Sequence, residues 1–134
     1  MSVLDNAIQA LFDMAHKEVL WTNASPTSTF REQSVKIRTL SNYDLIAIQY
    51  KSANISSAYV DIIVSEIIYN QLLACSIPSG IDSTTNYVQF NARTCKLMSN
   101  SLQFEPAYYK NSADYARVVN NALMIPLKIY GVKI

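Results

Sequence analysis

Apolar residues near the N-terminus recur at helical spacing. Steps of four and three residues separate the members of one apolar stripe: Leu4, Ile8, Leu11 and Ala15. Such spacing is typical of one face of an α-helix. Ser2 followed by Asp5 fits a helix start, because the serine hydroxyl can cap the first turn while the acidic side chain bonds back to it. The pattern predicts a short helix over about residues 3–17, and we assign residues 1–18 to this N-terminal segment.

A helix of this length needs a packing partner. Isolated helices of roughly 15 residues are marginal in water, and two heptads are too few for an independent coiled coil. Two arrangements would bury the apolar stripe: the helix lies on its own domain, or three copies bundle together. The sequence leaves both arrangements open and makes residues 1–18 a candidate trimerisation segment or shaft end.

From Val19 onward the apolar residues follow a period of two, which is the pattern of β-strands with one buried face. The clearest runs are 35–38, 43–50, 60–64, 88–93, 102–105 and 125–130. Their apolar positions give an expected core: Val35, Ile37, Ile46, Ile48, Val60, Ile62, Val64, Val88, Phe90, Phe104, Leu127 and Ile129. Residues 67–76 fit either a strand or a helical turn.

Three of these runs carry further information. The run 43–50 is nearly continuously apolar, which indicates a central strand covered on both faces. Runs 88–93 and 102–105 flank the turn residues 99–101 and should pair as an antiparallel hairpin. Pro126 lacks an amide donor, so the last strand should have a bulge there or start at a sheet edge.

Polar connectors separate six or seven short strands, which favours a sandwich over parallel α/β units. We therefore expect an all-β fold, an antiparallel β-sandwich of about 6 to 8 strands over residues 19–134, preceded by the short α-helix. A length of 134 residues suits one domain of this kind.

Composition narrows the classes of function. Hydrophobic residues make up 50% of the chain and charged residues 16%, as in a folded domain rather than a disordered one. The 11 Lys and Arg against 10 Asp and Glu give a formal net charge of +1, so we expect no nucleic-acid partner. No apolar run approaches the roughly 20 residues of a membrane span, and the N-terminus does not resemble a signal peptide. We expect no membrane insertion and synthesis in a cytoplasm.

Residues suited to catalysis or metal binding are sparse. His16 is the single histidine and falls on the expected helix, far in sequence from Cys75 and Cys95, so we expect no catalytic triad. The paired ligands of zinc sites and the clustered acids of calcium sites are missing. We interpret both cysteines as buried reduced thiols, with a disulfide between them as the alternative. The expectation is no catalytic residue, no metal and no cofactor.

Tyrosine, with nine copies, is the abundant residue type that suits ligand binding. Aromatic rings stack on the flat faces of sugars, while amide, carboxylate and guanidinium groups bond their hydroxyls. One segment mixes these side chains and is the predicted ligand-binding site: Tyr108, Tyr109, Asn111, Asp114, Tyr115 and Arg117. The structural alternative is that Tyr108 and Tyr109 end a strand while Tyr115 covers the edge of the core.

Several segments, taken in order, resemble a known kind of domain. They are Leu20-Trp21-Thr22-Asn23, residues 25–30 (SPTSTF), residues 43–46 (YDLI), the hairpin around Arg93-Thr94, and residues 125–134 (IPLKIYGVKI). Together they are similar to the C-terminal knob, or receptor-binding domain, of tail-fibre and baseplate proteins of phages that infect Gram-positive bacteria. The match runs from about residue 20 to residue 134.

The resemblance implies a jelly-roll-like β-sandwich knob at the distal end of an adhesive device, commonly a homotrimer. The expected function is non-enzymatic attachment of a virion to a bacterium. Its partners would be a cell-surface polysaccharide or protein and other virion structural proteins. The alternative is a purely structural virion protein, such as a trimeric fibre tip, a capsid decoration or an assembly domain. Both place the protein in the virion after synthesis in the host cytoplasm.

Overall fold

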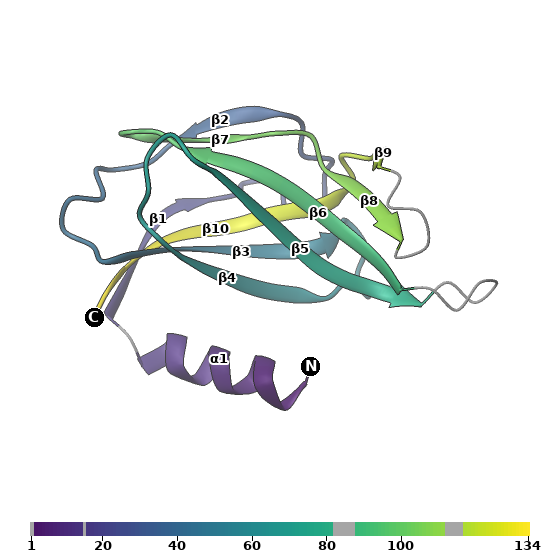
Figure 1. The fold of residues 1–134 in the computed structure, drawn as a ribbon, viewed down its shortest axis with the longest axis horizontal. Coiled ribbons are helices and arrows are strands. Elements are labelled where there is room, and N and C mark those ends of the chain that lie inside the picture. Colours follow the sequence, from purple (N-terminus) through teal and green to yellow (C-terminus); the bar gives the residue numbers. More distant parts are fainter. Residues whose placement is uncertain (1, 15, 82–87, 112–116) are drawn as a thin grey trace.

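Two antiparallel β-sheets face each other in the computed structural model, and one helix lies on the outer face of the first sheet (Figure 1). The structure describes residues 2–14, 16–81, 88–111 and 117–134. These residues form one helix and ten strands, more than the 6 to 8 strands expected. The fold class is the antiparallel β-sandwich that the period-two pattern predicts.

The first sheet has four strands in the order β1 (His16–Thr22), β10 (Leu123–Lys133), β3 (Leu45–Ala53) and β4 (Val60–Glu66). β3 is central, as the run 43–50 predicts: Ile46, Ala47 and Ile48 are all buried, so both of its faces are covered. The register between β10 and β3 shifts between Pro126 and Lys128. Because β10 has neighbours on both sides, the proline is accommodated by this bulge and not by a sheet edge.

The second sheet is built around β6 (Val88–Leu97). β5 (Leu72–Ile81) pairs along one edge of β6, while β7 (Ser101–Phe104) and β8 (Tyr108–Asn111) pair with successive parts of the other edge. β2 (Gln33–Lys36) pairs with β7, and β9 (Val118–Val119) pairs with β8. The predicted hairpin is confirmed, with Leu97 of β6 opposite Leu102 of β7.

The main core lies between the two sheets. Six expected core residues are buried in it: Val35, Ile37, Ile46, Ile48, Phe104 and Ile129. Leu127 packs against this core and is half-buried. Aromatic rings fill one part of it, because Phe30 and Phe104 meet edge to face with 5.3 Å between ring centroids, and Trp21 lies beside both.

The prediction for β4 placed the wrong face in the main core. Val60 and Val64 are exposed, and Ile62 is buried in a second cluster beneath the helix. Their alternate neighbour Ile63 packs against the main core instead. Both faces of β4 carry apolar residues because the helix covers part of the outer one, so period-two alternation could not distinguish them.

β6 also faces the opposite way from the prediction. Cys95 and Leu97 belong to the main core, and Arg93 is fully buried. Residues at odd positions therefore point inward. Phe90 is only half-buried, and the side chain of Val88 lies outside the described residues.

The helix α1 (Val3–Met14) begins as predicted. The amide of Asp5 donates to Ser2 Oγ at 3.1 Å, and Ser2 Oγ donates to Asp5 Oδ2 at 2.9 Å. α1 ends at Met14 rather than near residue 17, and His16 is the first residue of β1. Pairing of β1 with β10, in which His16 is opposite Lys133, takes the place of the last predicted helical turn.

Phe12 attaches α1 to the first sheet. Its ring is buried in the second cluster, 5.1 Å from the ring of Tyr130 in an edge-to-face contact. The other buried members of this cluster are Ala47, Ile62 and Val132. Leu4 and Leu11 of the predicted stripe each remain 68% exposed. The helix thus lies on its own domain, but through a residue outside the predicted stripe.

Candidate functional site

The predicted ligand-binding segment runs from β8 to the residue before β9. The structure describes the side chains of three of its six members: Tyr108, Tyr109 and Arg117. The other three predicted residues lie outside the described part of the chain: the side chain of Asn111, and the whole of Asp114 and Tyr115. β8 is held against β6, with Ala92 opposite Tyr108.

Tyr108 and Tyr109 point to opposite faces of the second sheet, since successive strand residues alternate. Tyr109 is opposite Asn91, whose side-chain amide reaches across the sandwich and donates to the carbonyl of Ser52 in β3 at 3.0 Å. Tyr109 is therefore on the inner face and Tyr108 on the outer face. The guanidinium carbon of Arg117 lies 3.9 Å from the centroid of the Tyr108 ring, a cation–π stack.

The structure thus brings Tyr108 and Arg117 together and separates the two tyrosine rings. Tyr108 is buried, whereas Arg117 is exposed. A guanidinium carries its N–H donors in its own plane, so a stacked arginine keeps these donors available for hydroxyl, carboxylate or phosphate groups. The group that meets solvent here is the arginine, with the ring beneath it as support.

Arg93 is a buried charge that the sequence pattern misplaced on the solvent side. Its guanidinium donates to four backbone carbonyls at 2.9 to 3.1 Å: those of Phe30, Glu105, Leu123 and Met124. These carbonyls lie in separate parts of the chain, so Arg93 joins β6 to β10 and to two connecting segments. Burial lowers the pKa of Arg93 to about 10, which still leaves it charged at neutral pH.

Cys75 and Cys95 are buried free thiols, as interpreted from the sequence. They lie beside the fully buried Tyr50, whose pKa is raised well above its ordinary value mainly by burial. The hydrogen bond with Cys75, together with burial, raises the pKa of Cys95. A thiol with a raised pKa is neutral and a weak nucleophile, so Cys95 is suited to packing.

Charged side chains gather in a surface groove where β1, the segment before β3 and the C-terminus meet. Glu18 is at its centre: the Tyr43 hydroxyl donates to Glu18 Oε2, and the Arg38 guanidinium lies 3.3 Å from the same oxygen. His16 Nε2 lies 3.9 Å from the other oxygen. The Tyr43 hydrogen bond, assisted by Arg38 and His16, lowers the pKa of Glu18. Glu18 offsets the charge of Arg38, and its contacts with Tyr43 and Arg38 fasten β1 to the segment before β3.

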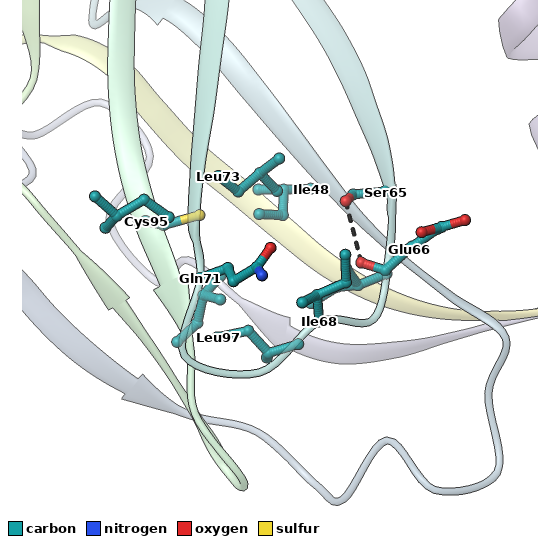
Figure 2. A pocket seen from close by; sticks show the side chains of 11 residues that line it. Ile48, Ser65, Glu66, Ile68, Gln71, Leu73, Cys95 and Leu97 are labelled. Atoms are coloured by element: carbon teal, nitrogen blue, oxygen red, sulfur yellow. Dashed lines mark hydrogen bonds between the residues drawn. The ribbon is translucent and has the colours of Figure 1, made fainter.

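A pocket of about 120 Å³ opens between β4 and β5, the outermost strands of the two sheets on this side (Figure 2). Its floor consists of apolar side chains from the main core and one thiol: Ile46, Ile48, Leu73, Cys95, Leu97 and Leu102. Its mouth is lined by Ser65 and Glu66 of β4, by Leu72 of β5, and by Ile68 and Gln71 of the segment that joins the two strands.

The pocket interrupts the main core. Native interiors are close-packed, so a pocket whose floor is made of core side chains departs from that packing. Sequence reasoning missed the site, because its floor residues look like any other core positions. The single signal was the apolar segment 67–76, which fitted two kinds of secondary structure.

A scan against models of known protein families finds none that matches the chain, and a search of curated proteins finds no match either. Within the described ranges, no group of three or more His, Cys, Asp or Glu side chains could hold a metal ion. The helix that these ranges contain, with 12 residues, is not long and apolar enough to cross a membrane.

Proposed function

We propose that this protein is a non-enzymatic attachment module of a bacteriophage virion, a tail-fibre or baseplate knob that recognises a bacterial surface glycan or receptor. The observation that carries the proposal is the Tyr108–Arg117 stack within the segment predicted to bind. The resemblance of residues 20–134 to phage knob domains supports the same assignment. The proposed location is the virion.

Arg117 suits this role because its position is partly fixed before a ligand arrives. An exposed arginine loses rotamer freedom when it binds, and ordering a flexible side chain opposes association. Stacking on the buried Tyr108 ring restricts Arg117 in advance. The cell walls of Gram-positive bacteria offer sugar hydroxyls and phosphate groups, and a guanidinium donates hydrogen bonds to both.

A structural role in the virion is the second candidate, and exposed apolar surface on α1 favours it. Val3, Leu4 and Leu11 are 87%, 68% and 68% exposed. Self-association as a homotrimer would bury this surface at about 25 cal/mol per Å², and closed cyclic symmetry is the usual arrangement of identical subunits. Attachment and trimerisation are compatible, since knobs that bind glycans weakly gain avidity from several copies.

Binding to glycan fragments tests the attachment role. We expect the protein to bind at least one fragment in a set of wall polysaccharides and teichoic acids, and Arg117→Ala to weaken that binding by tenfold or more. Arg117→Lys should restore it only in part, because lysine lacks the planar donor set. Arg31→Ala, at another exposed arginine, is the matched control.

Melting temperatures of all three variants should stay close to that of the parent protein. Tyr115→Ala tests the rest of the predicted segment in the same assay, because Tyr109 is on the inner face of the sandwich. Unchanged binding in Arg117→Ala would remove the stack from the proposed site, and a collapsed melting temperature in that variant would assign the stack a structural role.

A further inference from the structure

We propose that the pocket between β4 and β5 is a binding site for a small uncharged molecule, with one aromatic ring on the apolar floor and a hydroxyl group at Gln71. The pocket shares no residue with the predicted attachment segment, so the two proposals stand or fall separately.

The floor selects for an apolar group of limited size. Ile48, Leu97 and Leu102 line it and are themselves 0 to 5% exposed, so a ligand that touches them is inside the core. Apolar cavities of about 150 Å³ lined by Leu, Ile and Phe stay dry and bind benzene. A pocket of about 120 Å³ that is open at its mouth therefore suits one ring on the floor, with a small substituent of that ring at the opening.

The mouth supplies the polar contact. Figure 2 shows the Gln71 amide directed toward the space between Leu73, Ile48 and Ile68. An amide both donates and accepts hydrogen bonds, so it can pair with a hydroxyl on the ring. The Ser65 hydroxyl already donates to the carbonyl of Glu66 at 3.1 Å, which leaves Gln71 as the better-placed partner.

Charge at the mouth excludes one class of ligand. Glu66 is exposed and lines the opening, and Figure 2 shows its carboxylate pointing away from the floor. An anionic ligand would approach this negative charge and then lose water on entering an apolar floor, and both steps oppose binding. Neutral ligands meet neither obstacle.

Titration of the full chain with phenol, toluene and benzoate tests the site by nuclear magnetic resonance. We expect phenol and toluene to shift the methyl signals of Ile48, Leu73 and Leu97 in a saturable way, and benzoate to leave them unchanged. The methyl signals of Val132 belong to the separate cluster beneath α1 and should not move.

Two variants test separately how the floor and the mouth of the pocket contribute to binding. Leu97→Phe should fill the space and abolish the shifts by both phenol and toluene. Gln71→Ala should weaken the binding of phenol by a few-fold to about tenfold. The affinity for toluene should stay within about twofold of that of the parent protein. Gln103→Ala, at an exposed glutamine on the outer face of β7 that does not line the pocket, is the matched control.

Three results would overturn the proposal. The first is that millimolar phenol and toluene leave the floor methyl signals of the parent protein unchanged. The second is that Gln71→Ala, which does not alter the core, affects phenol and toluene equally. The third is the detection of contacts from a second copy of the chain to Ile48 without any probe, because the pocket would then be part of an interface between copies.

Discussion

Arg93 donates from inside the sandwich to four backbone carbonyls, and no carboxylate of the described residues forms an ion pair with it. A buried charge is tolerated only when its hydrogen bonds are made, and the carbonyls around it depend on the same bonds. The Phe30 ring, with its centroid 5.1 Å from the guanidinium carbon, adds a cation–π contact. Arg93 thereby fixes the connecting segments on either side of the core.

Replacing Arg93 by Met tests this role. The substitution keeps an apolar stem of similar length but leaves buried carbonyls without donors, so we expect a loss of roughly 3 to 5 kcal/mol in the free energy of unfolding. Urea denaturation measures the loss. Arg31→Met, at an exposed site, should change stability by less than about 0.5 kcal/mol, and an equally small effect at Arg93 would contradict the account.

Tyr43→Phe should change how stability depends on pH. The tyrosine hydrogen bond is the largest cause that lowers the pKa of Glu18 below its ordinary 4.5. A carboxyl with a lowered folded-state pKa stabilises the fold above the unfolded value, and that contribution is lost as pH falls through the folded value. The stability difference between parent and variant should therefore be constant from about pH 7 to 5 and shrink below pH 4.5.

Phenylalanine is the suitable replacement for Tyr43 because it keeps the aromatic ring and removes the hydroxyl group. A Cβ placed on Gly131 would lie 2.7 Å from Tyr43 ring carbons, so the ring packs directly on the glycine backbone and only the hydroxyl should be removed. Urea denaturation of the parent protein and of Tyr43→Phe at several pH values measures this difference in stability. A difference that stays the same from pH 7 to pH 3 would show that the hydroxyl does not act through Glu18.

For the helix and strands, features set by residues close in sequence were predicted better than features set by packing partners distant in sequence. The Ser2–Asp5 cap is local, and it is confirmed. The buried faces of β4 and β6 were wrong for different reasons: a helix covers part of the outer face of β4, whereas β6 directs a charged residue, Arg93, into the core. Alternation alone does not contain that information.

The two candidate sites also differ in how far they could be predicted from the sequence. The sequence selected Tyr108 and Arg117 because their residue types suit glycans, and the structure places them in contact. The pocket between β4 and β5 depends on how two sheets meet, and its floor residues come from four strands of both sheets, β3, β5, β6 and β7. No pattern within a short stretch of sequence predicts how the two sheets pack at this pocket.

The apolar stripe of α1 predicts assembly. Leu4→Gln combined with Leu11→Gln should leave the fold nearly unchanged, because both side chains are largely exposed in the single chain. The same pair should convert a sedimenting trimer into a monomer if the stripe is the contact. Val119→Gln, another exposed apolar position, serves as the control. A parent protein that sediments as a monomer would reject the trimer.

In the whole molecule, the two proposed surfaces belong to different layers. α1 covers the outer face of the first sheet, whereas Tyr108 is on the outer face of the second sheet, with Arg117 over its ring. Self-association through α1 would leave the second sheet accessible. A trimer of this kind would present three Tyr108–Arg117 stacks at once, which raises avidity without any new contact.

Attachment itself is measured most directly by sedimenting the protein with purified cell walls from a panel of Gram-positive bacteria. The account predicts that the parent protein pellets with walls of at least one strain and is released when their polysaccharide is removed. Arg117→Ala should stay in the supernatant while Arg31→Ala pellets like the parent. A parent protein that pellets with none of the walls, or an Arg117→Ala variant that pellets equally well, would contradict the proposed function.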